Sequence, residues 1–162
     1  MSYDTNPFSP DDTDRHAIWE AVVRRDIDAF LAQDWGMCAE DFHAEHFMGI
    51  DAGAEGDPDR WQLSYPTLEA YRDDWLRQAA AFARHHYRDD PREALFRATQ
   101  LEVIEIRGES AILHKKFNGA ITREDGTVDP IVWQTIYRMR KIDGRWKLTG
   151  FIGYLPNPIS IA

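Results

Sequence analysis

The chain has 162 residues, a formal net charge of −9 and a hydrophobic fraction of 43%. This length allows one domain with its own core, and the acidic balance argues against nucleic acid as a partner, because binding phosphates requires basic side chains. No apolar run reaches the roughly 18 residues of a membrane-spanning helix, so no membrane partner is expected. The single cysteine, Cys38, cannot form an intramolecular disulfide, and the amino terminus lacks the pattern of a secretory signal, so a cytoplasmic location is predicted.

The first half of the chain has helical patterns. Residues 1–12 are rich in Asp, Pro and Ser and are predicted to form a flexible arm. A helix capped by Thr13 or Asp14 is expected next, followed by a second short helix that starts at Asp26 and ends near Gln33. A third helix is expected from Pro66, because apolar residues then recur at helical spacing. Its apolar stripe includes Leu68, Tyr71, Trp75, Leu76 and Ala79.

Residues 41–50 alternate between apolar and polar side chains, which predicts a half-buried strand. His46 falls on the apolar face of this pattern. A histidine in such a place is a candidate general acid or base, because its pKa lies near neutrality. Asp34, Asp41 and Asp51 are the nearby carboxylates that would orient it. The alternative is a core or interface histidine that binds a backbone carbonyl.

The last third of the chain is patterned as sheet. Strands are expected at about 97–107, 110–122, 131–142 and 145–154, and Asp143-Gly144 is a strong signal for a tight hairpin turn. Short connections of this kind predict antiparallel pairing. Trp146 and Leu148 are expected to pack against the helices. Helices followed by a meander of strands indicate an α+β fold.

Three segments carry a resemblance to a known superfamily, namely residues 24–31, 65–71 and 143–148. Together with the order of the elements, they resemble the nuclear transport factor 2-like superfamily, which includes SnoaL-like polyketide cyclases, ketosteroid isomerases and scytalone dehydratase. The resemblance implies a cystatin-like α+β barrel, in which a strongly curved, cone-shaped antiparallel sheet wraps around three N-terminal helices. It also implies a pocket at the open end of the cone and a homodimer formed through the outer face of the sheet. We expect a single domain over residues 13–158 and a C-terminal tail over residues 159–162.

Aromatic residues on the predicted strands and third helix are the candidate ligand-binding residues. Trp133 and Tyr137 share one strand face, which is typical of a small-molecule pocket wall and equally of ordinary core packing. Tyr71 and Trp75 of the third helix are included in this set. On the strand 110–122, His114 and Lys115 point to opposite faces, and a lysine that faced the interior would need a paired carboxylate. The sequence leaves open which of the two faces inward.

Two hypotheses about function follow. In the first, the cone binds a small, apolar, oxygenated molecule and catalyses isomerisation, dehydration or cyclisation without a cofactor, with His46, Asp41 and Asp34 as the catalytic residues. In the second, the protein is a non-catalytic dimeric binding module whose cone is filled by aromatic side chains. No metal is expected, because no cluster of histidine or cysteine residues has the spacing of a zinc site.

Overall fold

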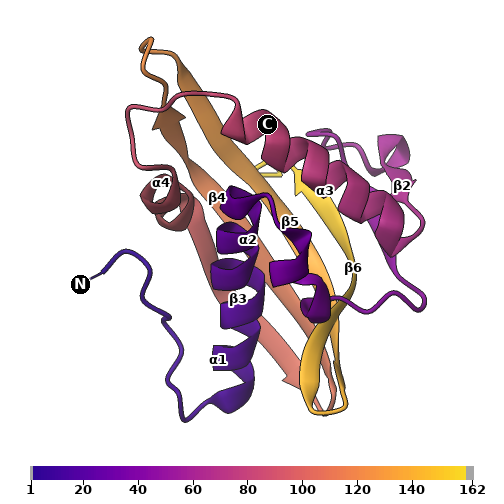
Figure 1. Ribbon diagram of the computed structural model, residues 1–162. Helices are drawn as coiled ribbons and strands as arrows, with labels where there is room; N and C mark the ends of the chain where they lie inside the picture. The colour runs from indigo at the N-terminus through magenta and orange to yellow at the C-terminus, as the bar shows by residue number, and fades with distance from the viewer. Residues whose placement is uncertain (1, 160–162) are drawn as a thin grey trace.

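The computed structural model describes residues 2–159, and within them helices lie on one side of a curved sheet (Figure 1). The α-helices are α1 (Thr13–Trp19), α2 (Asp26–Ala32), α3 (Leu68–Ala83) and α4 (Pro91–Ala98). A π-helix, η1 (Glu20–Arg25), joins α1 to α2. Short 3-10 turns are η2 (Trp35–Met37), η3 (Ala39–Asp41) and η4 (Pro58–Arg60).

The sheet has six strands in the order β2-β1-β6-β5-β4-β3. They are β1 (Met48–Asp51), β2 (Gln62–Tyr65), β3 (Thr99–Arg107), β4 (Ser110–Thr122), β5 (Val128–Ile142) and β6 (Arg145–Leu155). Strands β3 to β6 form an antiparallel meander, whereas β1 runs parallel to β6. The α+β architecture predicted from the sequence is therefore confirmed, and the prediction of a wholly antiparallel sheet is wrong at this one pair.

The hairpin at Asp143-Gly144 forms as the sequence predicted. Both residues have positive φ, 50° and 78°, which is the conformation of the tight turns that match the twist of paired strands. The long strands β4 and β5 pair from Ser110 to Thr122 without a break in register. The sequence located these strands closely because their signals, alternation and turn residues, are local.

The N-terminal helices are continuous, and the predicted helix pair is wrong in this respect. Asp12 rather than Thr13 or Asp14 caps α1, since its side chain accepts from the amide of Arg15. At Asp26, where a second helix was expected to begin, the backbone stays helical with φ −59° and ψ −50°. The chain passes through the wider turns of η1 at this point, so Asp26 lies inside a long helix.

Two other predicted elements differ from the structure. Residues 41–50 form a 3-10 turn and a loop, and only β1 is a strand, so the alternation of side chains was misleading. Residues 91–98 form the helix α4, which the sequence analysis did not anticipate. Its start has a clear signal, because Asp90 caps it and Pro91 occupies its first turn.

The N-terminal segment is tied to the helices. Tyr3 packs edge-on against Phe96, and Asp4 pairs with Arg24 and Arg92. The predicted flexible arm at 1–12 thus makes specific contacts over its described residues. The domain boundaries at 13 and 158 stay predictions, and the tail at 159–162 lies outside the described residues except for Ile159.

One anchor joins α1 to the closing hairpin. The indole Nε1 of Trp146 donates to the Oδ1 of Asp14 at 2.8 Å, and the ammonium of Lys141 lies 3.0 Å from the same oxygen. These hydrogen bonds, that of Trp146 first, lower the pKa of Asp14 below its ordinary value of 3.8. Trp146 and Leu148 are both buried against the helical layer, as the sequence predicted.

We therefore expect Asp14→Asn to destabilise the protein at pH 7 by about 1 kcal/mol, a figure kept small because Asp14 is partly exposed. Since the pKa of Asp14 is lower in the folded than in the unfolded state, its contribution is present above about pH 4 and is lost as the pH falls through the folded-state pKa. Thermal unfolding of both proteins between pH 7 and pH 2 should show the two curves converging in acid. Asp11→Asn, at an exposed position, is the control, and a pH-independent gap for Asp14→Asn would contradict the assignment.

Candidate functional site

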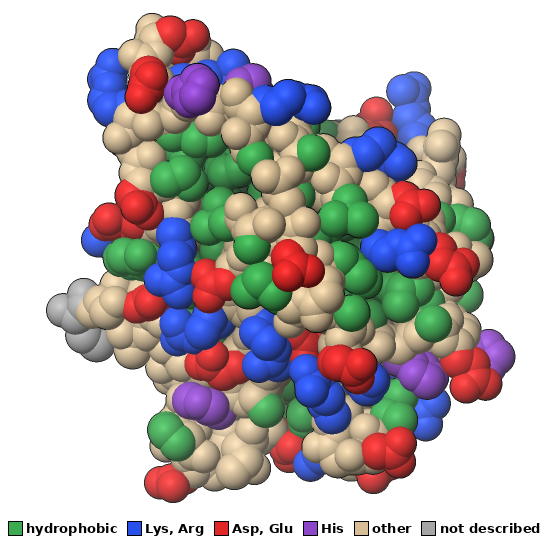
Figure 2. All heavy atoms as spheres, in the orientation of Figure 1, with side chains coloured by type: hydrophobic (Ala, Val, Ile, Leu, Met, Phe, Trp, Pro, Cys, Tyr) green, Lys and Arg blue, Asp and Glu red, His purple; other side chains and the backbone are tan. Residues whose placement is uncertain are grey.

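A cavity of about 410 Å³ lies between the helices and the inner face of the sheet. Its walls are mostly apolar and aromatic side chains from α2, α3, α4, β4, β5 and β6. Figure 2 shows apolar side chains gathered below the charged projection at the upper left of the molecule, where Figure 1 places the tip of the β4–β5 hairpin. The main apolar wall residues are Ile27, Phe30, Phe82, Leu95, Phe117, Ile121, Ile131 and Phe151. Walls of this kind, interrupted by a few polar groups, are typical of small-molecule sites.

The carboxylate of Asp26 lines this cavity and has two donors as partners. The ammonium of Lys115 lies 3.1 Å from its Oδ2, and the indole Nε1 of Trp75 donates to its Oδ1 at 3.3 Å. Lys115 is 0% exposed and also donates to the carbonyl of Val22 at 2.6 Å. The Asp26 side chain keeps 28% exposure, so it can accept a further hydrogen bond from a molecule in the cavity.

The position of Lys115 follows from the register of the sheet. It lies on the inner face of β4 between Leu113 and Phe117, and its ammonium is 4.9 Å from the ring centroid of Phe117. His114 points to the other face and bonds to the side chain of Gln134. A buried ammonium needs acceptors and a compensating charge, and the helix supplies both through Val22 and Asp26.

Strand β6 directs Tyr154 into the cavity by means of an irregular register. Phe151 pairs with Tyr137, but Leu155 pairs with Gln134, so β6 has one residue more than β5 between these pairs. Tyr154 lies in this bulge with a φ of 57°, a conformation that is uncommon for a residue with a side chain. Bulges redirect side chains in this way and recur beside functional sites.

Gln78 of α3 orients the Tyr154 hydroxyl. The amide Nε2 of Gln78 donates to the Tyr154 oxygen at 2.9 Å and to Asp74 at 2.8 Å, and Asp74 also accepts from the Tyr65 hydroxyl at 2.6 Å. Because the Tyr154 oxygen accepts from Gln78, its own proton can be donated to a ligand. Burial raises the pKa of Tyr154 to about 12, so this phenol carries its proton at neutral pH.

Two further phenols have the same character. Tyr71 and Tyr137 line the cavity, and burial raises the pKa of each well above its ordinary value. Both rings contact Phe151, at centroid distances of 4.8 Å and 6.0 Å. Beside the apolar walls, the cavity therefore presents the Asp26 carboxylate together with neutral phenol donors.

The rim of the cavity is polar. Arg123 pairs with Asp129 at 2.6 Å, and both side chains are about 30% exposed, at 28% and 30%. His85 and Tyr87 stand beside them, with their rings in an edge-on contact at 6.2 Å.

All four aromatic residues predicted to bind a ligand line the cavity: Tyr71, Trp75, Trp133 and Tyr137. They come from α3 and β5, and Trp133 stacks on Phe117 at 4.5 Å. That these residues contact a ligand stays a prediction.

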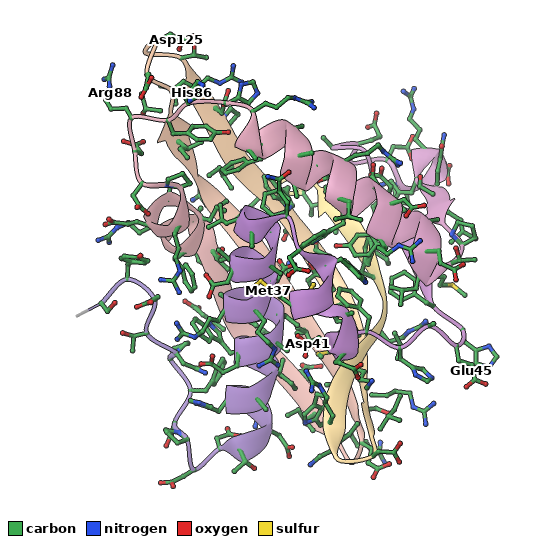
Figure 3. The ribbon with its side chains drawn as sticks, in the orientation of Figure 1. Met37, Asp41, Glu45, His86, Arg88 and Asp125 are labelled. Atoms are coloured by element: carbon green, nitrogen blue, oxygen red, sulfur yellow. The ribbon has the colours of Figure 1, made fainter. Side chains whose placement is uncertain are left out.

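The structure does not bring the three predicted catalytic residues together. His46 lies in a turn before β1 with its side chain 87% exposed, and it faces Glu45, which projects from the right-hand edge of the molecule in Figure 3. Asp41 is 1% exposed and is held by Arg25 and Arg145, at distances of 2.8 Å from each. Asp34 caps the turn η2. None of the three lines the cavity, so the assignment of His46 to an inward strand face was wrong.

The sequence analysis missed Asp26 and Tyr154 as site residues. Asp26 was interpreted as the start of a second helix, and its role depends on its long-range contacts with Lys115 and Trp75. The inward lysine on β4 was the available signal, because such a lysine requires a carboxylate from another element. Tyr154 reaches the cavity through a register shift in β6, which the alternation of side chains along a strand does not reveal.

The described residues also bear on metal binding, thiol chemistry and membrane spans. Among residues 2–159, no group of three or more His, Cys, Asp or Glu side chains is arranged to hold a metal ion. Burial raises the pKa of the Cys38 thiol, so it is not activated as a nucleophile. Within the same residues, no helix has the length and apolar character needed to cross a membrane.

Comparisons with known proteins agree on the fold. No protein-family model and no curated protein matches the chain. A nuclear transport factor 2-like structure from Salmonella enterica is 12% identical, with 90% of this chain and 93% of that chain covered and a TM-score of 0.57. A protein of unknown function with a cystatin-like fold from Nostoc punctiforme is 14% identical over 90% and 92% of the two chains, also with a TM-score of 0.57.

A third structure, from Shewanella baltica, is a nuclear transport factor 2-like protein of unknown function that is 14% identical over 91% and 96% of the two chains, with a TM-score of 0.55. At these identities the likeness shows the fold alone. The chain therefore has the nuclear transport factor 2-like, cystatin-like fold, a curved sheet around helices with an interior cavity. The resemblance to the SnoaL-like subgroup stays a prediction.

The buried pair gives a prediction about stability. We expect Lys115→Met to lower the free energy of unfolding by roughly 3 kcal/mol, because it leaves the Asp26 carboxylate without its compensating charge. The double variant with Asp26→Leu and Lys115→Met should recover at least half of this loss. Denaturant unfolding measures both, with Lys116→Met on the opposite face of β4 as a control that stays within about 0.5 kcal/mol of the parent. Equal stabilities for Lys115→Met and Lys116→Met would contradict the role of the pair.

Proposed function

We propose that the protein binds a small, apolar, oxygenated molecule in the cavity and transfers a proton on it without a cofactor, in an isomerisation, dehydration or cyclisation. The observation that carries this proposal is the Asp26 carboxylate in the wall of an apolar cavity of about 410 Å³ that also holds the hydroxyl of Tyr154. Fold alone does not determine function, so the argument rests on these side chains.

The cavity supports binding of a flat ring system. Trp75, Trp133 and Phe117 offer aromatic faces, and the volume lies within the range of small-molecule sites. A cone filled by aromatic side chains, the alternative expected from the sequence, would leave no such space. The cavity therefore supports the binding hypothesis over the filled module.

The polar groups support proton transfer. Asp26 would accept a proton from a carbon next to a carbonyl, and the electron pair of that C–H bond would form the double bond of an enolate. Negative charge then develops on the carbonyl oxygen, where the neutral hydroxyl of Tyr154 donates a hydrogen bond. Returning the proton from Asp26 to a different carbon completes an isomerisation, with no oxidant or metal in the balance.

Exchange of carbon-bound hydrogen tests this chemistry directly. We expect the protein to accelerate the loss of the C1 hydrogen signals of 2-tetralone, a neutral bicyclic ketone, in deuterated buffer near neutral pH, as followed by NMR. Asp26→Asn should reduce the accelerated rate by about 100-fold or more, and Tyr154→Phe by about 10-fold or more.

Matched variants on α3 distinguish exchange in the cavity from exchange at the protein surface. Ala81 lines the cavity, so Ala81→Trp should fill it and abolish exchange, whereas Ala83→Trp, at an exposed position on the same helix, should leave the rate unchanged. A parent protein that gives only the buffer rate would contradict the catalytic part of the proposal. If Trp fluorescence still reported 2-tetralone binding, the non-catalytic module would be the better description.

We also propose that the outer face of the sheet pairs with a second copy of the chain in the cytoplasm. Apolar side chains on β3, β4 and β5 support this, since Val103, Ile112, Val132 and Ile136 are all exposed. The only cysteine, Cys38, is a buried thiol, which accords with a reducing compartment.

Sedimentation of the purified protein should therefore give twice the mass of one chain at micromolar concentration. Ile136→Lys should shift it to single chains, because it places a charge in the apolar face. Met37→Lys, on an exposed methionine of the helical segment labelled in Figure 3, is the control and should leave the mass unchanged. A single-chain mass for the parent protein would contradict the homodimer.

A further inference from the structure

The charges around the cavity are balanced in pairs. Among residues 2–159, three side chains that are charged at neutral pH line it, namely Asp26, Arg123 and Asp129. Asp26 is compensated by Lys115 at 3.1 Å, and Arg123 and Asp129 compensate each other at 2.6 Å. No charge among these groups is left over to meet a charged ligand.

Lys115 contributes to this balance without touching the ligand space. It is completely buried and does not line the cavity, and its ammonium is shared between Asp26 and the carbonyl of Val22. We call the part of the cavity wall formed by the Asp26 carboxylate the floor. Lys115 thus neutralises the charge of the floor without facing the cavity, while Asp26 provides the hydrogen-bond acceptor. A charged ligand would lose its hydration in the apolar cavity and find no unpaired opposite charge there, which makes its binding unfavourable.

We propose that Lys115 is a specificity-determining residue that makes the cavity select uncharged ligands over charged ones, and that among uncharged ligands a hydroxyl group adds a hydrogen bond to Asp26. This inference rests on the proposed binding function and adds to it the charge class of the ligand. The hydroxyl donor satisfies the free acceptor capacity of Asp26, and a second oxygen on the ligand accepts from Tyr154. Anions are excluded because Asp26 already holds the ammonium of Lys115, and cations are excluded because Lys115 already neutralises the Asp26 carboxylate.

Four probes of one ring size test the proposal: naphthalene, 2-naphthol, 2-naphthoate and 2-naphthylmethylammonium. Dissociation constants are measured by titration calorimetry, with the fluorescence of Trp75 and Trp133 as a second readout. In the parent protein, 2-naphthol should bind at least about 10-fold more tightly than either charged probe, a difference of about 1.4 kcal/mol. It should also bind more tightly than naphthalene, because only 2-naphthol donates to Asp26.

Two single variants should change the order of the four probe affinities in opposite directions. Lys115→Met leaves the floor with a net negative charge, so the ammonium probe should gain at least about 10-fold relative to 2-naphthol. Asp26→Asn leaves it positive, so the carboxylate probe should gain by a similar factor. Lys116→Met, the neighbour on the outer face, should preserve the order of the parent protein.

The double variant with Asp26→Leu and Lys115→Met removes both charges. It allows the same comparison of probe affinities if Lys115→Met alone does not fold. In this variant, 2-naphthol should bind no better than naphthalene. An unchanged order of the four probes across the variants, or a parent protein that prefers 2-naphthoate, would overturn the role of Lys115 while leaving the cavity a binding site. If none of the probes bound the parent protein, the proposed function would fail together with this inference.

Discussion

A lysine ammonium among leucine and phenylalanine side chains must be compensated, and the compensation of Lys115 by Asp26 connects the two halves of this molecule. The pair joins the inner face of β4 to the long N-terminal helix at 3.1 Å, so the sheet and the helical layer are held in one relative position. It also leaves the Asp26 carboxylate facing a cavity that is otherwise mostly apolar. Stability and the proposed chemistry therefore depend on the same contact, because the buried Lys115 compensates the charge of the partly exposed Asp26.

Local signals predicted the meander but not the elements that depend on distant contacts. The turn at Asp143-Gly144 and the strand at 110–122 have their information in adjacent residues, and both are confirmed. In residues 41–50 the alternation resembles a strand, yet Asp41 is fixed by Arg25 and Arg145, so tertiary ion pairs decide the backbone there. The helix continues through Asp26 for a similar reason, since burial against the sheet outweighs the capping tendency of a single Asp.

The candidate site shows the same contrast between residues that local patterns place correctly and residues that depend on distant contacts. Tyr71, Trp75, Trp133 and Tyr137 line the cavity because helical and strand periodicity alone places them on inward faces. Tyr154 reaches the cavity only through an extra residue in β6, and alternation cannot anticipate where register slips. His46 illustrates the converse error, since its apolar neighbours in sequence are not its neighbours in space. Pairing between distant elements is the information that a single sequence does not show.

The π-helical segment η1 has a consequence for the angle at which Asp26 points. In an α-helix the amide of Asp26 would donate to the carbonyl of Val22. Here, where η1 ends, it donates to the carbonyl of Val23, three residues back, and Lys115 donates to the Val22 oxygen. Each π-type hydrogen bond encloses one residue more than an α-type bond. Removing that residue would turn everything after it by roughly 100° about the helix axis. A single extra residue in the helix thus fixes the rotational position of Asp26 about the helix axis, so that its carboxylate points toward Lys115 and the cavity.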